Sequence, residues 1–398
     1  MTNQEKKVPE LRFPEFDGEW DITTIEKIAK VSKGFTPSTK DINLWQNDNK
    51  NWLSIAGMSD KYIYEGNKGI SSAGEGKHKK VNKDTLIMSF KLTLGKLAIV
   101  KTPIYTNEAI CHFEWKTNQL KTEYMYYYLS FINIKSFGAQ AVKGITLNND
   151  SINSILIKLP GFLEQEKIGT FFSKLDQQIE LEEKKLAKLE EQKKGYMQKI
   201  FSQELRFKDE KGNDYPEWEV KQLKEILEFS NKRTTKENEY PILTSSRKGL
   251  ILQSDYYKEG KTFADSNVGY FILPKNFITY RSRSDDGIFK FNLNQIIDTG
   301  IISKYYPVFK GINSNQYYLA LHLNNQLKKE YIKYATGTSQ LVLSHKNLQE
   351  IKTKLPFYDE QTKIADFLIK FDELIEKQNQ KIDGLKSRKK GFLQKMFV

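Results

Sequence analysis

The stretch LPGFLEQEKI at residues 159–168 recurs as LPFYDEQTKI at residues 355–364, and it belongs to a long internal repeat. Residues 152–201 align without a gap on residues 348–397, at a constant offset of 196 and with about 21 of the 50 positions identical. A match of this length indicates repeated structural units rather than chance. The chain is therefore predicted to contain two copies of one plan.

Each repeat is predicted to form a long helix that begins after its Leu-Pro pair, because proline disfavours helix at the residue before it. Residues 164–201 contain no proline and are rich in the helix formers Lys, Glu, Gln and Leu. Apolar residues recur at the heptad spacing of a coiled-coil seam, which a solvated charged helix would lack. In the first copy they are Ile168, Phe172, Leu175, Ile179, Leu186, Leu189, Tyr196 and Ile200. We expect the two helices to pair as an antiparallel coiled coil.

Polar residues within the seam predict a register for this pairing. Antiparallel helices pair positions whose residue numbers sum to a constant. A sum of 571 would set Glu182 against Lys389, whereas a slip of one heptad would set Glu182 against Ile382 or Met396. An unpaired carboxylate among apolar neighbours is costly. We therefore expect the Glu182 and Lys389 side chains to lie within about 4 Å of each other.

The blocks between the repeats are predicted to be two compact α+β domains. They are rich in Tyr, Phe, Ile, Thr, Gly and Asn, with short β-prone runs between turn residues. Residues 85–90 and 97–100 are predicted to be strands around a turn at Gly95, and residues 277–282 and 288–291 to form the matching hairpin. Short helices are expected near residues 123–133 and 316–329. The two domains share this outline but not their sequence.

The fold class is therefore α+β, with two globular domains alternating with two long helices in a circular pseudo-two-fold repeat. The motif Glu10-Leu-Arg-Phe13 recurs as Glu204-Leu-Arg-Phe207 directly after the first helix, so the second helix is predicted to end beside residue 10. The predicted boundaries are 1–151 for the first domain, 152–201 for the first helical region, 202–347 for the second domain and 348–398 for the second helical region.

Composition favours a polyanionic partner. Lys and Arg number 63 against 50 Asp and Glu, which gives a net charge of +13 and a pI near 9.2. No apolar run approaches the roughly 18 residues that a membrane span requires, and the first residues lack the apolar core of a signal peptide. We expect a cytoplasmic protein with no membrane role.

Motifs for catalysis are missing from the sequence. Residues 255–262 imitate a phosphate-binding loop without its first glycine, and no dinucleotide fingerprint follows a strand. Cys111 is the only cysteine, which excludes a disulfide framework, and the scattered histidines have no metal-ligand spacing. Cys111 and His112, as neighbours on a strand, would point to opposite faces. We therefore expect no catalytic residue, cofactor or metal site in this chain.

Together these features resemble one family closely. Two variable domains alternate with two Leu-Pro-x3-Glu-Gln-x-Lys-Ile helices, each closing in Lys-Lys-Gly-aromatic-x-Gln-Lys. This arrangement, over essentially the whole chain, resembles the DNA-specificity (S) subunit of type I restriction–modification enzymes. The alternative is a coiled-coil scaffold protein that binds nucleic acid without specificity.

The resemblance implies a non-catalytic subunit of a larger complex. Each variable domain would be a target-recognition domain that reads one half of an asymmetric bipartite site in double-stranded DNA. The coiled coil would set the spacing and dock two methyltransferase (M) subunits, and two restriction/translocase (R) subunits would complete the assembly. S-adenosylmethionine, ATP and magnesium would bind to those partner subunits.

Candidate DNA-binding residues are cations and polar side chains in loops and hairpins, because bidentate donors read base edges and cations contact phosphates. The strongest candidates are Tyr280, Arg281 and Arg283, since strand alternation would put both arginines on one face. The alternative is a solvent-exposed edge strand whose charged side chains prevent pairing with another chain. The corresponding hairpin of the first domain offers Lys91, Thr93 and Lys96. The remaining candidates, for which ordinary turns and solvated faces are the alternative, are Lys33, Thr36, Lys143, Thr146, Arg233, Arg247, Ser339 and Gln340.

Overall fold

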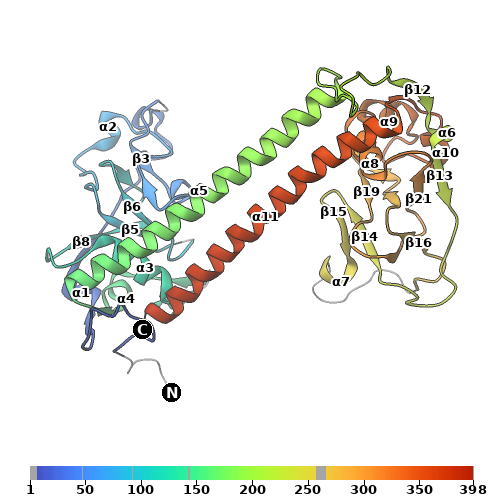
Figure 1. Cartoon of the computed structure of the whole chain (residues 1–398). Helices are drawn as coiled ribbons and strands as arrows, with labels where there is room; N and C mark the ends of the chain where they lie inside the picture. Colours follow the sequence, from blue (N-terminus) through green and yellow to red (C-terminus); the bar gives the residue numbers. More distant parts are fainter. Residues whose placement is uncertain (1–6, 47, 92, 142–143, 257–265, 398) are drawn as a thin grey trace. The chain divides into compact units, whose positions relative to one another are not determined.

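The computed structural model describes residues 7–46, 48–91, 93–141, 144–256 and 266–397. The chain forms two compact units, which are described separately. Unit 1 combines Met1–Lys184 with Asn379–Val398, and unit 2 comprises Lys185–Gln378. Each unit therefore contains one globular domain and parts of both long helices, α5 (Phe162–Phe201) and α11 (Tyr358–Met396) (Figure 1).

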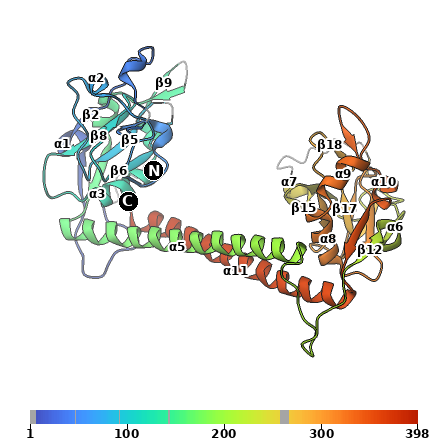
Figure 2. The same cartoon turned by 90° about the horizontal axis from the view of Figure 1, so that it is seen from above.

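Unit 1 is built around a five-stranded sheet of order β2-β8-β5-β6-β4. The helix α3 packs on β5 and β6 and also lies beside the first half of α5 (Figure 2). The elements of its globular part are β1 (Asp21–Thr24), α1 (Ile25–Ile28), β2 (Ala29–Lys33), η1 (Ile42–Leu44), β3 (Trp52–Leu53), η2 (Ile55–Gly57), β4 (Tyr62–Ile63), α2 (Ser72–Glu75), β5 (Leu86–Ser89), β6 (Leu97–Val100), β7 (Tyr105–Thr106), β8 (Ile110–Trp115), α3 (Thr122–Phe131), η3 (Ile134–Phe137), β9 (Ala139–Ala141), β10 (Gly144–Thr146), α4 (Asn149–Asn153) and β11 (Leu156–Leu159).

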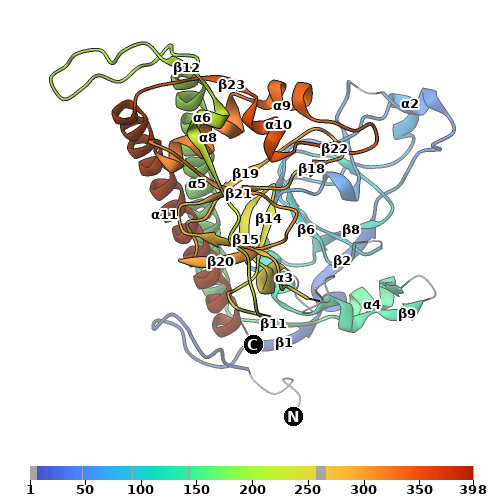
Figure 3. The same ribbon diagram turned by 90° about the vertical axis from the view of Figure 1, so that its right-hand side faces the viewer.

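Unit 2 contains a four-stranded sheet of order β13-β21-β17-β19, with α8 packed on β19 and β21. A separate two-stranded sheet, β12–β23, leads into α11 (Figure 3). The elements of its globular part are β12 (Glu219–Gln222), α6 (Leu223–Ile226), β13 (Leu227–Ser230), β14 (Leu243–Ser246), β15 (Gly249–Leu252), α7 (Gln253–Tyr256), β16 (Phe271–Pro274), β17 (Ile278–Tyr280), β18 (Arg283–Ser284), β19 (Phe291–Leu293), β20 (Thr299–Ile302), β21 (Val308–Gly311), α8 (Gln316–Asn325), α9 (Lys328–Tyr334), β22 (Leu341–Val342), α10 (His345–Gln349) and β23 (Lys352–Leu355).

The two units share one plan, as the repeat predicted. The order β2-β8-β5-β6 of unit 1 matches β13-β21-β17-β19 of unit 2, and the pair β1–β11 matches β12–β23. The predicted hairpin β5–β6 is confirmed, with Gly95 at φ +77° in its turn. The strands β17 and β19 also pair as predicted, but β19 begins at Phe291 because residues 281–290 leave the sheet and β18 pairs with β22.

The Leu-Pro-x3-Glu-Gln motif fixes the start of each long helix to its domain. The Gln165 side chain donates a hydrogen bond to the Pro160 carbonyl (2.9 Å) and accepts one from the Lys121 backbone amide (3.1 Å). Gln361 repeats both bonds, with the Pro356 carbonyl (2.9 Å) and the Asn315 amide (3.0 Å). Each motif thereby satisfies backbone groups that a buried helix start would otherwise leave unpaired. The strands β11 and β23, which precede the motifs, belong to the globular domains.

Within each unit the two long helices run antiparallel, as predicted. In unit 1 Lys389 contacts Asp176 (2.5 Å) and Lys381 contacts Glu182 (3.0 Å). The ring centroids of Phe171 on α5 and Phe392 on α11 lie 5.1 Å apart. In unit 2 Lys193 pairs with Asp372, which repeats the first of these pairs at the offset of 196.

The predicted register is wrong. Both Asp–Lys pairs have residue numbers that sum to 565, not 571, so Glu182 meets Lys381 instead of Lys389. The prediction assumed that a carboxylate beside Ile382 would have no partner, yet the Lys381 ammonium reaches it at 3.0 Å. It also overlooked Asp176 and Asp372 as seam residues, and these two carboxylates receive the seam lysines.

The end of α11 inserts into the core of unit 1, which confirms that the second helix ends beside residue 10. The Leu11 amide donates to the Lys395 carbonyl (2.9 Å), as Leu205 does to Lys199 after the first helix (3.0 Å). The Phe397 ring packs among buried aromatic rings of unit 1, including Trp20, Tyr124 and Phe172. Its counterpart Phe201 packs on Tyr318 in unit 2 (5.9 Å between centroids).

Candidate nucleic-acid interface

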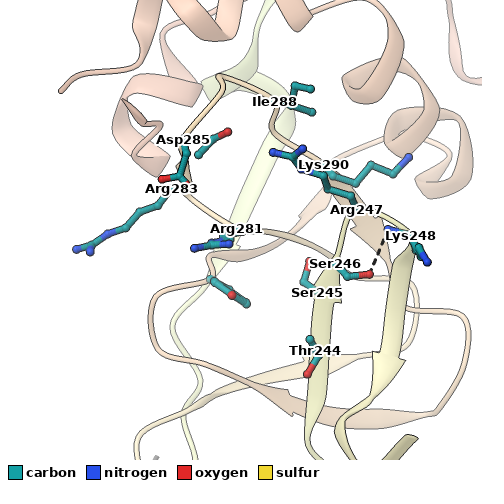
Figure 4. A pocket seen from close by; sticks show the side chains of 12 residues that line it. Thr244, Ser245, Ser246, Arg247, Lys248, Arg281, Arg283, Asp285, Ile288 and Lys290 are labelled. Atoms are coloured by element: carbon teal, nitrogen blue, oxygen red, sulfur yellow. Dashed lines mark hydrogen bonds between the residues drawn. The ribbon is translucent and has the colours of Figure 1, made fainter. Parts of the chain in front are cut away.

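A basic pocket of about 510 Å³ lies in unit 2 between the β14–β15 turn and the segment that links β17 to β19 (Figure 4). Among its lining residues, five are cations and one is a carboxylate. These charged residues are Arg247, Lys248, Arg281, Arg283, Lys290 and Asp285. The local excess of positive charge suits a polyanion such as a nucleic-acid backbone.

Arg247 crosses from its turn to the opposite wall of the pocket. Its guanidinium pairs with the Asp286 carboxylate at 2.6 Å, and Figure 4 shows the side chain extending toward the 281–290 segment. Asp286 Oδ1 also accepts a hydrogen bond from the Ser284 hydroxyl (2.9 Å) and from the Ile288 amide (3.2 Å). These hydrogen bonds, that of Ser284 first, lower the pKa of Asp286, which is therefore ionised at neutral pH.

The pocket brings together several residues that the sequence predicted separately. Arg281 and Arg283 are exposed and line it, and Arg283 lies over the Tyr305 ring at 5.8 Å. The Gln340 amide donates to the Asp285 carboxylate (2.7 Å), which places it beside the same loop. Ser339 is exposed next to Gln340.

Sequence reasoning missed Lys290, which lines the same pocket. Burial, together with the charges of Lys328 and Lys193, lowers the pKa of Lys290. The alternation of Phe289, Lys290 and Phe291, in which both phenylalanines are buried, is the signal that could have found it.

The prediction for Tyr280 is wrong. Its side chain is fully buried, and its hydroxyl donates to the Leu343 carbonyl (2.9 Å), so it belongs to the core of unit 2. Arg233 lies outside the pocket lining and packs over the Phe271 ring (4.0 Å), with one guanidinium nitrogen donating to the Gly269 carbonyl (2.9 Å).

Two of the first-domain candidates line different pockets of unit 1. Lys33, at the end of β2, lines one of about 240 Å³ that also contains Lys79 and Lys80. Lys96 lines another of about 530 Å³ with Lys61 and Lys135.

The local contacts of the remaining first-domain candidates differ. The Thr36 hydroxyl bonds the Glu108 carboxylate, whereas Lys91 and Thr93 are exposed. Thr146 pairs through its backbone with Ala139, and Lys143 lies outside the described residues.

The Cys111–His112 pair is unsuited to nucleophilic chemistry. Burial raises the pKa of the Cys111 thiol to about 12, so it carries no thiolate at neutral pH. Burial lowers the pKa of His112 to about 4, and its ring hydrogen-bonds the Thr106 hydroxyl at 2.5 Å. Both residues are structural parts of β8.

The described residues contain neither a cluster of metal-ligating side chains nor a membrane-spanning helix. In the part of the chain that the structure describes, no three His, Cys, Asp or Glu side chains are grouped to hold a metal ion. Among the same residues, none of the helices has the length and apolarity needed to cross a membrane.

Comparisons with known proteins agree with the duplicated plan. The family model described as "Type I restriction modification DNA specificity domain" matches residues 17–191 and again residues 215–387. The chain is 28% identical over 229 residues to the type I restriction enzyme MjaIX specificity subunit of Methanocaldococcus jannaschii, a match covering 54% of this chain and 52% of that relative. It is 25% identical to the MjaVIII specificity subunit of the same organism, over 98% of this chain and 93% of that relative. The chain thus spans about half the length of the first relative and nearly all of the second.

Two solved structures have the same fold. The type I restriction–modification S subunit from M. genitalium gives a TM-score of 0.60 at 15% identity, over 98% of this chain and 99% of that chain. The HsdS subunit from Thermoanaerobacter tengcongensis gives 0.50 at 15% identity, over 100% and 99%. Because the family model matches most of both halves of the chain, the chain belongs to the type I restriction modification DNA specificity family, the specificity subunits of type I restriction–modification systems.

Proposed function

We propose that each unit reads one half of an asymmetric bipartite site in double-stranded DNA. The observation that carries this proposal is that the two units share their sheet order and helix contacts but differ in the loops that present cations. The sheet order, the Leu-Pro-x3-Glu-Gln contacts and the Asp–Lys pairs are repeated in both units, whereas the loops that present cations differ in sequence and in their pockets. Two similar frames with different reading loops suit two different half-sites.

The other subunits of the complex carry the chemistry in this proposal. The chain itself is non-catalytic, and two methyltransferase subunits dock on the paired helices, which set the spacing of the half-sites as a coiled coil. Two restriction/translocase subunits complete the assembly in the cytoplasm, where chromosomal DNA is available. S-adenosylmethionine, ATP and magnesium bind to those partners. A solved structure with a similar fold is titled for the complex assembly and conformational transition of the type I restriction–modification system, which supports a place for this chain in a larger complex.

The proposal is tested by exchanging one reading domain. Asp21–Leu159 of this chain is replaced by the matching segment of another family member, because β1 pairs with β11 and closes the domain at its base. The chain, assembled with its methyltransferase subunits, then selects DNA from a randomised double-stranded library. We expect a two-part motif in which the exchange alters one half only.

Two outcomes would contradict the proposal. A change in both halves would show that the units do not read independently. Binding without any selected motif would favour the alternative, a scaffold protein that binds nucleic acid non-specifically. The matched control exchanges Glu219–Leu355, which spans the β12–β23 pair of unit 2 and should alter the other half of the motif.

A further inference from the structure

Arginine is distributed very unevenly between the two reading domains. The sequence has no arginine between Arg12 and Arg206, so the first domain contains none apart from Arg12. Arg12 and Arg206 are equivalent structural residues, since each pairs with a buried glutamate at the start of a long helix. Apart from these two structural residues, all four arginines of the reading domains belong to the second domain. They are Arg233, Arg247, Arg281 and Arg283.

Three of these four arginines line the same basic pocket of unit 2. Arginine presents a planar fork of N–H donors that matches the O6 and N7 acceptors of guanine in the major groove, and this is the commonest specific protein–DNA contact. Positive charge alone could be supplied by lysine, which after Arg12 is used in place of arginine throughout the first domain. The clustering of arginines in one pocket therefore indicates base reading in addition to phosphate contact.

Arg247 differs from the other two arginines because its guanidinium is held in place. Asp286 pairs with it at 2.6 Å, and Asp286 is itself fixed by the Ser284 hydroxyl (2.9 Å) and the Ile288 amide (3.2 Å). The Arg247 and Asp286 side chains are 60% and 45% exposed, and salt bridges at such exposure contribute little to stability. Holding a guanidinium toward a ligand is a better explanation, because it reduces the entropy lost on binding.

We infer that the half-site read by unit 2 contains a G·C pair, that Arg247 reads its guanine, and that Asp286 is the positioning residue for Arg247. This inference rests on the proposed reading of DNA by unit 2 and adds the base and the residue that recognises it. One Arg247 nitrogen contacts Asp286, and the rest of the guanidinium fork faces the base.

The test compares Arg247→Ala with Lys248→Ala. Both residues are exposed in the β14–β15 turn, so the two variants remove the same charge from neighbouring positions. Each variant of the full chain, assembled with its methyltransferase subunits, selects DNA from the randomised library. The domain exchanges described above assign each half of the motif to its unit.

For the wild-type chain we expect a G·C pair in the half-site of unit 2. Arg247→Ala should reduce the preference for guanine at that position by roughly 5- to 150-fold and leave the other half unchanged. Lys248→Ala should weaken binding to all sequences alike and keep the motif, as expected for a phosphate contact. Hydrogen exchange of unit 2 checks that both variants remain folded.

Asp286→Asn separates positioning from simple charge. Removing a carboxylate near the phosphates should strengthen binding to every sequence, whatever the role of Asp286. A positioning role also predicts a severalfold loss of guanine preference, which a purely electrostatic role would leave intact.

Three outcomes would overturn the inference. They are a half-site of unit 2 without a G·C pair, an Arg247→Ala motif identical to that of Lys248→Ala, and an unchanged guanine preference in Asp286→Asn. In these cases the two-part motif and its response to domain exchange would still stand, so the proposed function would survive. If the wild-type chain selected no motif at all, the proposed function would fail first.

Discussion

Arg12→Ala should strongly destabilise unit 1, because it leaves a buried carboxylate without its partner. The Arg12 guanidinium holds both oxygens of Glu164, at 2.8 and 2.7 Å, and donates to the Gly18 carbonyl at 2.6 Å. The Glu164 side chain is only 2% exposed. Breaking a buried pair by removing one partner costs about 3–5 kcal/mol, mostly because the remaining charge is left uncompensated.

The repeat provides an internal test of this reasoning. Arg206 holds Glu360 in the same way, at 3.1 and 2.8 Å, and Glu360 is 1% exposed. Arg206→Ala should therefore destabilise unit 2 by a similar amount. Arg388→Ala, at an exposed position of α11, is the matched control and should change stability by no more than about 0.5 kcal/mol.

Urea unfolding that is monitored by hydrogen exchange gives a separate unfolding midpoint for each unit. With a urea dependence of about 1–3 kcal/mol per molar, a loss of about 3 kcal/mol shifts the midpoint of the affected unit by roughly 1–3 M. Adding Glu164→Gln to Arg12→Ala should recover part of the loss, because no buried charge then remains. A loss below about 1 kcal/mol for Arg12→Ala, or an equal loss in both units, would refute this reasoning.

Three further predictions concern other parts of the chain. Burial lowers the pKa of His112 to about 4 and that of His322 to about 3, so the unfolded chain binds more protons than the folded chain below pH 6.5. The free energy of unfolding should therefore fall by about 1.3 kcal/mol per histidine between pH 7.5 and 5.5. Urea midpoints that do not move over this range would contradict this prediction. Gly195→Ala and Gly391→Ala should each stabilise the helices by about 0.5–1 kcal/mol, because a Cβ there meets open space, and unchanged thermal midpoints would count against this. Joining the termini with a short linker and reopening the chain near Ser202 should preserve DNA selection by the assembled complex, whereas loss of the motif in a folded permuted chain would argue against circular equivalence.

The fold was largely predictable because its signals are local or repeated. The heptad pattern of residues 164–201 defines a helix without knowledge of its partner, and alternation around Gly95 defines the β5–β6 hairpin. The register of the helix pair was not predictable in this way. It depends on where Phe201 and Phe397 insert into the globular cores and on lysines outside the apolar seam, such as Lys381.

The candidate site was only partly predictable, for a similar reason. Arg281 and Arg283 stand out within one short segment, and both line the pocket. Asp286 lies 39 residues from Arg247, and local patterns contain no information about that pairing. Tyr280 was misassigned because alternation shows that a side chain faces away from its neighbours but not which face of the strand is buried.

The repeated contacts explain how such a chain can keep one architecture while its reading loops differ. In unit 1 the Asp176 carboxylate of α5 contacts both Tyr127 of the globular domain and Lys389 of α11. In unit 2 the Asp372 carboxylate of α11 contacts both Tyr317 of the globular domain and Lys193 of α5. In each unit one carboxylate therefore links the globular domain to both long helices. The β14–β15 turn, which carries Arg247 and lines the pocket, makes none of these contacts. Substitutions in that turn can therefore alter recognition at little cost to the frame. The same separation predicts that stability and specificity respond to different residues, with Arg12 and Arg206 affecting the first and Arg247 the second.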